Sequence, residues 1–571
     1  MSDYSQIMRA PRAGAEALDY PLDCRTTAGV APLASFLLPS FGAIVFAVTL
    51  LQVLFLSQGA QGLFRDADTG WHIRNGETIL KTAALPREDS FSYTREGRPW
   101  FAWEWLSDVM LGSVYRIGGL AGVSLLAALS IALTVWGAAR LTLSLGGNFF
   151  FTAAAMVLLL GSSSLHWLAR PHVFSWLLAL LFLAVAEHER RSPGRALYVL
   201  PFAACLWANM HGSFLLGPAI LFLYAIGEWL ADWRRRNAGF RFGAACLVCL
   251  LATLVNPYGW RLHEHVFTYL RNNYLMDHVS EFRSFSFHSP GSFQVELFLF
   301  AAVLGVVALL RQRAFGPALL TLAMLHMALY SARHLPTAAV LLLPLCVAAL
   351  TREVENWPRM TSLVEYSERL RAIDVKVWGA VPLLLAPAAT VAGLGTLART
   401  GRAGFDSSVF PVHAADFLEQ HDLGRRAFAT DQWGGYLIYR FAGRAKVFID
   451  GRSDFYGQDF LETYAEVADV KPGWDRVLKQ YDVGLVLIPP NHALVSLLQL
   501  SSDWKRVYSD SVAVIFERAA ERRNNVSHGR KPVEFDQVRG RSPTRSASSI
   551  ERSLKKRGGT AQSRIVPPLR G

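Results

Sequence analysis

Long apolar stretches constrain this chain more than any other feature. A helix that crosses a lipid bilayer needs about 20 apolar residues, and somewhat fewer where neighbouring helices cover it. The sequence predicts an α-helical polytopic membrane bundle of about 11 spans, at 33–57, 119–144, 148–165, 172–188, 197–210, 213–232, 242–256, 294–311, 316–333, 335–350 and 377–398.

The composition points the same way. Apolar residues make up 52% of the 571 residues and charged residues 18%, whereas a typical soluble protein carries about 25% charge. A net charge of +12 ordinarily suggests a nucleic-acid partner, but residues 521–571 contain 13 Lys and Arg against 4 Asp and Glu, which leaves +3 for the rest. We therefore expect the lipid bilayer as a partner, and no nucleic acid.

Basic loops predict the orientation of the bundle, because short loops rich in Lys and Arg stay in the cytoplasm. Four such clusters lie within 190–195, 234–241, 311–313 and 351–376. They fall on alternate loops and share one side if the N-terminus is cytoplasmic. The intervening loops, and everything after residue 398, are then expected to be extracytoplasmic.

Four segments follow from these patterns. We predict a cytoplasmic N-terminal segment at 1–32, a transmembrane domain at 33–400 with its first external loop at 58–118, a soluble extracytoplasmic α/β domain at 401–520, and a disordered basic tail at 521–571. Short apolar strands are expected at 426–430, 446–450, 484–489 and 512–517, with helices between them, which indicates a largely parallel sheet. The pair Gly434-Gly435 is interpreted as a turn signal.

The first external loop carries the strongest candidates for chemistry. Asp66 and Asp68 lie at the end of a span, where carboxylates are expensive unless they are used. One of them can act as general base on an acceptor hydroxyl, or both can hold a divalent cation such as Mg²⁺ or Mn²⁺. Alternatively, they cap a helix that begins near Thr69. Glu104, in an aromatic run before an apolar helix, is either a second acidic participant or the partner of a nearby arginine.

Cations and amides recur at other span ends on the same side. Arginine binds phosphate through two N–H groups and stabilises charge on a leaving group; the alternative is that these arginines reach toward lipid headgroups and that the histidines satisfy helix ends. The candidates for binding a phosphate or donor are Arg170, His172, Asn209, His211, Arg261 and Arg333.

A second group of polar residues follows an expected strand in the soluble domain. Asp450, Arg452 and Asp454 lie where open α/β sheets build their sites. They can hold a sugar or face the membrane site, and the alternative is an Asp-Gly turn held by local hydrogen bonds.

This arrangement resembles the GT-C membrane glycosyltransferases. An N-terminal span is followed by a long external loop that opens with Asp66 and Asp68 and carries Glu104 near its end. The family includes protein O-mannosyltransferases, aminoarabinose transferases of lipid A and RgtA/B/C/D-like bacterial enzymes. The resemblance covers about residues 33–400, with its motifs within 64–106. The sequence is also similar to bacterial membrane proteins with D-x-D-x-x-W-H near the start and F-I-D-G-R-x-D-x-Y near the end.

The resemblance implies an inverting glycosyltransferase of the bacterial inner membrane, which moves a sugar from a polyprenyl-phosphate-linked donor to an acceptor on the external face. It makes Asp68, in preference to Asp66, the catalytic carboxylate, with Glu104 as a second acidic group and Arg170, Arg261 and Arg333 on the phosphate. The outer domain lacks a W-W-D-x-G signature, which argues against Asn-glycosylation. Metal dependence is open.

A non-enzymatic function is the alternative: a lipid-linked sugar transporter, or an envelope-assembly scaffold with a GT-C-like bundle. A transporter is expected to show inverted repeats or paired half-helices near the bilayer midplane. The sequence shows no such repeat.

Overall fold

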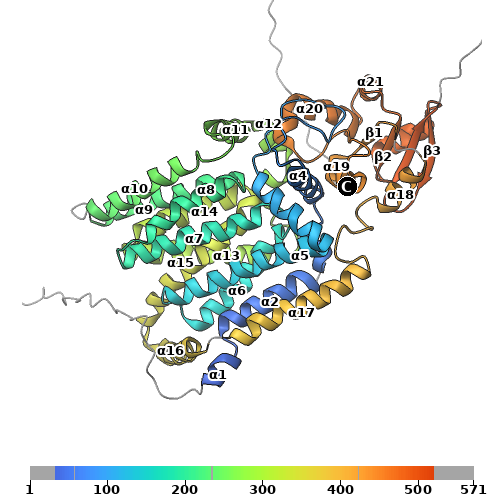
Figure 1. Ribbon diagram of the computed structural model, residues 1–571. Coiled ribbons are helices and arrows are strands. Elements are labelled where there is room, and N and C mark those ends of the chain that lie inside the picture. The colour runs from blue at the N-terminus through green and yellow to red at the C-terminus, as the bar shows by residue number, and fades with distance from the viewer. Residues whose placement is uncertain (1–31, 57, 233–235, 378, 422–423, 520–571) are drawn as a thin grey trace, which may run out of the picture. The chain divides into compact units, whose positions relative to one another are not determined.

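The computed structural model describes residues 32–56, 58–232, 236–377, 379–421 and 424–519 (Figure 1). The predicted tail at 521–571 lies outside the described residues, and so does the predicted N-terminal segment apart from Pro32. The described residues up to Ala519 belong to one compact unit. The predicted boundaries between the membrane and soluble domains stay predictions.

The bundle consists of apolar helices. In the described part of the chain, seven are long and apolar enough to cross a membrane: Ser35–Phe55, Trp105–Ser144, Phe149–His166, His172–Arg191, Gly212–Ala231, Ser292–Arg311 and Ala332–Glu355. Four apolar helices are shorter, at Ala196–Ala208, Asn237–Ala252, Phe315–Tyr330 and Leu383–Arg399. The protein is therefore an integral, multi-pass membrane protein. Each predicted stretch overlaps one of these helices, but the number of eleven crossings stays a prediction, because four of the helices are short.

The element bounds are as follows. The helices before the last apolar helix are α1 (Pro32–Leu37), α2 (Phe41–Phe55), α3 (Gly59–Gly62), α4 (Asp68–Thr82), α5 (Trp105–Ser144), α6 (Phe149–Ser163), α7 (His172–Arg191), α8 (Leu200–Ala208), α9 (Leu216–Ala231), α10 (Arg236–Ala252), α11 (Trp260–Leu270), α12 (Asn273–His278), α13 (Ser292–Arg311), α14 (Phe315–Tyr330), α15 (Leu335–Glu355) and α16 (Thr361–Lys376). The remaining helices are α17 (Ala380–Arg399), α18 (Val412–His421), α19 (Asp431–Phe441), α20 (Ser453–Ala468), α21 (Trp474–Gln480) and α22 (Ala493–Leu500).

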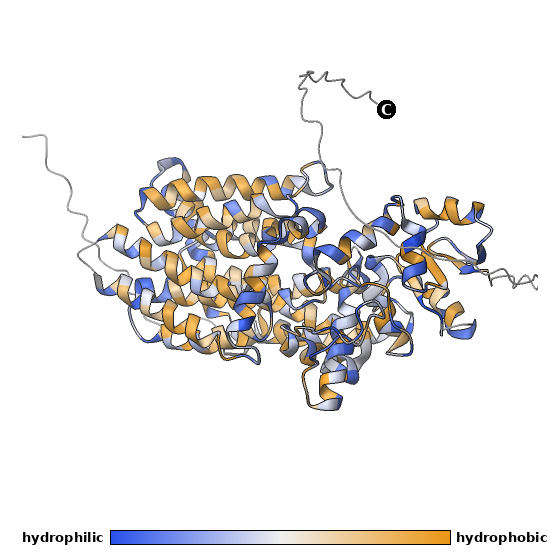
Figure 2. Ribbon diagram, turned by 90° about the horizontal axis from the view of Figure 1, so that it is seen from above, coloured by the Kyte–Doolittle hydropathy of each residue, from blue (hydrophilic) through white to orange (hydrophobic). Residues whose placement is uncertain are grey.

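Large apolar side chains cover the outside of the bundle, and Figure 2 shows hydrophobic colour along its helices. Phe202 is 79% exposed, Leu384 67% and Phe300 64%. Water disfavours apolar surface of this kind, whereas lipid chains solvate it. The backbone groups of a helix bond within the helix, as a lipid environment demands.

The basic loops meet at the far end of α5. Arg191 donates to the carbonyl oxygens of Ser144 and Leu145, each at 3.2 Å, and Arg352 also donates to Leu145 O at 3.2 Å. Arg371 donates to Leu143 O at 3.2 Å. Arginines satisfy the last carbonyls of a helix and complement the negative end of its dipole. Two of the four predicted clusters, 190–195 and 351–376, thus contact the end of α5 that is opposite its start at Trp105. Arg311 of the third cluster lies 3.4 Å from Glu353, which follows Arg352. Residues 234 and 235 of the fourth lie outside the described residues.

The sheet near the C-terminus is mixed, not largely parallel. Its order is β1-β2-β4-β3, from β1 (Ala427–Ala429), β2 (Leu485–Ile488), β3 (Trp504–Ser509) and β4 (Val514–Arg518). Only β1 and β2 are parallel among these neighbours, and the pairs of β4 with β2 and β3 are antiparallel. The prediction of a strand at 446–450 is wrong, because no strand forms there. Strand β3 was not predicted.

The segment mispredicted as a strand contacts the first loop instead. Val447 forms an isolated parallel bridge with Ser92, and its amide donates to Phe91 O at 3.0 Å. Thr94 Oγ1 donates to Phe448 O at 2.6 Å. Backbone groups of Val447 and Phe448 therefore bond to a segment far away in sequence. This pairing joins the first loop to the sheet-bearing part of the chain.

Candidate functional site

A cavity of about 1170 Å³ lies where the loops at one end of the bundle meet the sheet-bearing part of the chain. The lining residues from the bundle include Asp66, Asp68, Arg170, Glu281 and Arg333. The lining residues from the C-terminal part include Asp431, Trp433, Asp450, Gly451 and Tyr464. Polar groups from seven separate segments therefore converge on one space.

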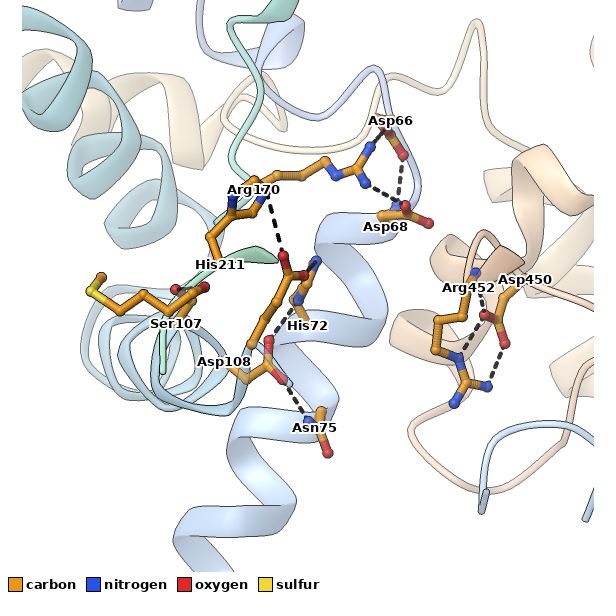
Figure 3. A network of polar contacts seen from close by, with 12 residues as sticks. Asp66, Asp68, His72, Asn75, Ser107, Asp108, Arg170, His211, Asp450 and Arg452 are labelled. Carbon is orange, nitrogen blue, oxygen red and sulfur yellow. Dashed lines mark hydrogen bonds and ion pairs between the residues drawn. The ribbon is translucent and has the colours of Figure 1, made fainter. Parts of the chain in front are cut away.

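Arg170 is the centre of this site, as Figure 3 shows. Its Nη1 forms ion pairs with Asp66 Oδ2 and, at 2.8 Å, with Glu281 Oε1, and its Nη2 lies 3.0 Å from Asp68 Oδ2. Burial disfavours the charged guanidinium, but the three carboxylates outweigh burial and raise the pKa of Arg170 well above its ordinary value. The side chain is therefore a permanent cation held by three carboxyl groups.

Asp68 is the first residue of α4 and is buried, with 8% of its surface exposed. Asp66 Oδ1 accepts the Asp68 N–H at 2.9 Å, so Asp66 satisfies one of the free amides at the helix start. The capping alternative therefore holds for Asp66, and Asp68 lines the cavity; a catalytic role for either carboxylate stays a prediction. Among the described residues, no hydrogen bond engages Asp68 Oδ1.

Burial raises the pKa of Asp68 to about 8, and the negative charge of Asp66 adds to the shift, while Arg170 opposes it. A carboxyl with this pKa exchanges a proton near neutral pH, which suits a general base.

Gly451 presses its backbone against the Asp68 carboxylate. A Cβ on Gly451 would lie 2.8 Å from Asp68 Cγ, inside van der Waals contact, and closer still to Oδ1. The pair Gly434-Gly435 was predicted to form a turn, and this prediction is wrong. Both glycines lie inside helix α19. A Cβ on Gly434 would lie 2.6 Å from Asp450 Cα, and one on Gly435 would lie 2.7 Å from Ala67 C. These glycines let α19 approach both the start of α4 and the 450–452 segment.

We expect Gly451→Ala to lower the rate of any reaction that depends on Asp68 at least 10-fold, because the new methyl group must displace the Asp68 carboxylate and small misplacements of a reacting group are costly. The measurement is kcat/KM on purified protein. Gly118→Ala is the matched control, since a Cβ there meets nothing within 4 Å. Full activity of Gly451→Ala would contradict the placement of Asp68.

Glu281 and Arg333 extend the site. Arg333 Nη1 lies 3.3 Å from Glu281 Oε2, and its guanidinium lies 5.3 Å from the centre of the Phe282 ring. Burial opposes ionisation of Glu281, but Arg170 and Arg333 together lower its pKa below its ordinary value. Among the described residues, Arg333 thus pairs with one carboxylate, in contrast to Arg170.

A second polar cluster lies beneath Arg170 and includes residues that sequence reasoning missed. His72 Nδ1 lies 2.5 Å from Asp108 Oδ1, and Asn75 Nδ2 donates to Asp108 Oδ2 at 2.6 Å. These contacts tie α4 to α5. The signal was the spacing: His72 follows Asp68 by four residues and Asp108 follows Glu104 by four, so each pair shares a helix face.

Glu104 belongs to this cluster and does not line the cavity. Its Oε2 lies 3.8 Å from His72 Nε2 and its Oε1 lies 3.5 Å from His211 Nε2. Burial is the largest influence on it and raises its pKa to about 7, while burial lowers the pKa of His72 to about 3. Glu104 is therefore a largely buried acid between two imidazoles, and it lies outside the cavity that Asp68 lines.

The remaining bundle candidates lie outside the cavity lining. Asn209 donates to Cys205 O and Val255 O and accepts from Trp105 Nε1, so it satisfies helix ends. His172 Nε2 lies 2.8 Å from His166 O. Arg261 is exposed near the start of α11. Contact of these three residues, and of His211, with phosphate stays a prediction. Arg261 and Asn209 do not belong to the proposed site.

The three candidates near the sheet have different surroundings. Arg452 is 3% exposed; its Nε and Nη2 donate to the two Asp450 oxygens at 2.7 Å, and Nη2 also lies 2.8 Å from Asp89 Oδ1. Its guanidinium lies 4.6 Å from the Trp100 ring centre. Asp454 Oδ2 lies 3.0 Å from His265 Nε2. Arg452 is thus a buried link between the first loop and the 450–456 segment, and only Asp450 of the three lines the cavity.

The carboxylates do not fit the divalent cation that the sequence left open. Mg²⁺ and Mn²⁺ take several oxygen ligands around one point, but here the Arg170 guanidinium touches Asp66, Asp68 and Glu281. Within the described ranges, no three His, Cys, Asp or Glu side chains form a ligand set. The residues of this site therefore do not fit a divalent metal ion.

Comparison with known proteins identifies the fold. No protein-family model and no curated protein sequence matches this chain. Among solved structures, the apo oligosaccharyltransferase of Archaeoglobus fulgidus matches over 78% of this chain and 69% of its own, with a TM-score of 0.52 and 11% identity. The fold is GT-C-like.

Two further solved structures match this chain over most of its length. The archaeal oligosaccharyltransferase AglB from Archaeoglobus fulgidus, in complex with an inhibitory peptide and a dolichol-phosphate, matches over 78% of this chain and 69% of its own (TM-score 0.51, 10% identity). ArnT from Cupriavidus metallidurans, bound to undecaprenyl phosphate, covers 84% of this chain and 98% of its own (TM-score 0.44, 15% identity). The predicted structural similarity to GT-C proteins is confirmed.

Proposed function

We propose that this protein is an inverting glycosyltransferase that moves a sugar from a polyprenyl-phosphate-linked donor to an acceptor hydroxyl. The observation that carries the proposal is the cavity in which Asp68 offers an unbonded carboxylate oxygen beside Arg333 and Arg170. The GT-C-like fold supports it, as does the binding of dolichol-phosphate by AglB.

The proposed step needs one base and one anion site. The acceptor oxygen attacks the anomeric carbon, and its proton passes to Oδ1 of Asp68. The bond between the anomeric carbon and the phosphate oxygen breaks, and the polyprenyl phosphate leaves with the electron pair. Arg333 stabilises the charge on the departing phosphate through its N–H groups. Attack on the face opposite the leaving group inverts the anomeric centre.

The position of the basic loops supports an extracytoplasmic site. Arg191, Arg352 and Arg371 lie at the opposite end of α5 from the start that carries Glu104. Short basic loops stay in the cytoplasm. The proposed orientation places the cavity and residues 401–520 on the outer face of a bacterial inner membrane, with the N-terminus inside.

Glycan analysis of a deletion strain tests the proposed function. Mass spectrometry of envelope glycans and glycolipids is expected to show the loss of one sugar substituent, together with accumulation of its lipid-linked donor. Wild type restores the substituent and Asp68→Asn does not. A transporter or scaffold predicts instead that Asp68→Asn complements fully, which would overturn the enzyme assignment.

Substitution of Arg333 tests the phosphate site. We expect Arg333→Gln to lower kcat/KM for the lipid-linked donor roughly 10- to 100-fold, because it removes charge-assisted hydrogen bonds to the phosphate. The ion pair with Glu281 is partly exposed, so stability is expected to change little. Arg271→Gln, at an exposed arginine after α11, is the matched control. An unchanged KM and kcat in Arg333→Gln would remove Arg333 from the site.

The pH profile tests the identity of the base. Asp68 must be deprotonated to accept a proton, and its pKa is raised to about 8, mainly by burial. We therefore expect kcat/KM to rise with pH through about 8 and then level off. Asp66→Asn removes a negative charge that raises this pKa, so the rise is expected at lower pH in that variant. A profile that does not move would contradict the coupling of the two residues.

A further inference from the structure

The position of Arg170 carries an inference beyond the transfer reaction itself. Carboxylates from two separate segments, 66–68 and Glu281, point at one guanidinium. Such a convergence is the usual way that a protein holds a hard divalent cation. Here the cation is part of the chain.

We propose that the Arg170 guanidinium is the resident cation of this site, that it holds Asp66, Asp68 and Glu281 together in place of a divalent metal ion, and that the site therefore works without a metal. Only the EDTA assay, which measures sugar transfer, rests on the proposed function. The Mn²⁺ titrations do not.

Charge and geometry support the view that the Arg170 guanidinium takes the place of a metal ion. The Arg170 side chain is 15% exposed, and the carboxylates of Asp66, Asp68 and Glu281 are 25%, 11% and 23% exposed. Three carboxylates this close repel one another unless a cation lies between them. A guanidinium supplies five N–H donors in one plane, and Nη1 and Nη2 reach all three partners.

The second arginine completes the arrangement. Arg333 Nη1 lies 3.3 Å from the other Glu281 oxygen, so Glu281 bridges the two guanidinium groups. Arg170 is committed to the carboxylates, and Arg333 is left for the phosphate. A metal ion that bridges the three carboxyl groups has no place here, because one oxygen of each already accepts from Arg170 and the guanidinium lies between them.

Removal of Arg170 is expected to create the metal site that the wild type lacks. Arg170→Ala leaves three uncompensated carboxylates, which are costly unless they are protonated or bind a cation. We expect the purified Arg170→Ala protein to bind one Mn²⁺ per chain, at least 10-fold more tightly than wild type, by titration with electron paramagnetic resonance of free Mn²⁺. The double variant Arg170→Ala/Asp66→Asn is expected to lose this gain.

Two comparisons keep the experiment decisive. Arg170→Lys keeps a positive charge and is expected not to gain Mn²⁺; Arg170→Gln, uncharged and closer in size to arginine, replaces Arg170→Ala if that variant does not fold. In the transfer assay, wild type is expected to retain full activity in excess EDTA.

The proposal is overturned if wild type binds one Mn²⁺ that Asp66→Asn removes, if EDTA abolishes wild-type transfer, or if the folded, uncharged Arg170 variant gains no Mn²⁺. Mn²⁺ binding needs neither donor nor acceptor, so its result is independent of the proposed glycosyl transfer. Failure to detect any transfer while the Mn²⁺ results hold would count against the proposed function alone.

Discussion

Asp68→Asn is expected to reduce sugar transfer by a factor of roughly 100 to 10,000, the range that a general base contributes. Asparagine has nearly the shape of aspartate, but its amide cannot accept the proton of the acceptor hydroxyl. Binding of donor is expected to persist, since Arg333 lies on a different segment. The measurement is kcat under saturating donor and acceptor, on protein that elutes as wild type in size-exclusion chromatography.

Two variants isolate the role of Asp68. Asp66→Asn is expected to retain more activity, because Asp66 commits Oδ1 to the Asp68 amide and Oδ2 to Arg170. Asp459→Asn, at an exposed aspartate on α20, is the control for loss of one carboxylate and is expected to behave as wild type. If Asp66→Asn were inactive and Asp68→Asn active, the base would be Asp66.

Arg452→Met is expected to produce the largest loss of stability. The methionine fills much of the same volume but leaves Asp450 and Asp89 buried without their cation, which destabilises by about 3–5 kcal/mol. Hydrogen exchange of peptides that contain 89–100 and 447–456 is expected to accelerate roughly 100-fold or more, since each 1.4 kcal/mol corresponds to a factor of ten. Exchange within the bundle helices is expected to stay unchanged.

The controls for Arg452 separate charge from packing. Arg452→Lys keeps the charge but loses the planar fork, so an intermediate acceleration is expected. Arg444→Met removes an arginine whose side chain is 54% exposed and paired with Glu419, and its effect is expected to stay within about 1 kcal/mol. Unchanged exchange near Asp89 in Arg452→Met would show that this arginine does not connect the two segments.

Hydrophobic length predicted the helices well, because span-forming stretches are a local property of the sequence. The acidic pair at 66–68 was also accessible from sequence, since carboxylates at a span end are rare for a physical reason. Glu281 was not selected, because it lies in a long polar loop and only the fold places it 2.8 Å from Arg170. The connection between these residues is tertiary, so no spacing in the sequence encodes it.

The sheet was predicted less well, for a reason that two segments illustrate. Residues 446–450 have the apolar character of a strand, but their hydrogen bonds go to the first loop. Strand β3 alternates weakly, and every residue after Trp504 is exposed or half-buried, as is common for an edge strand. In both cases the partner decides the structure, and strand propensity depends strongly on such context.

The pairing of the first loop with residues 447–448 has a consequence for how the protein is made. Thr94 and Phe448 are 354 residues apart in sequence. At a synthesis rate of about 5–20 residues per second, roughly 20 to 70 seconds separate their emergence from the ribosome. During that interval Asp89 lacks its ion-pair partner Arg452, and the cavity lacks the lining residues of the C-terminal part. A chain that ends before Phe448 is therefore expected to contain all its apolar helices but to lack this pairing and the C-terminal lining of the cavity.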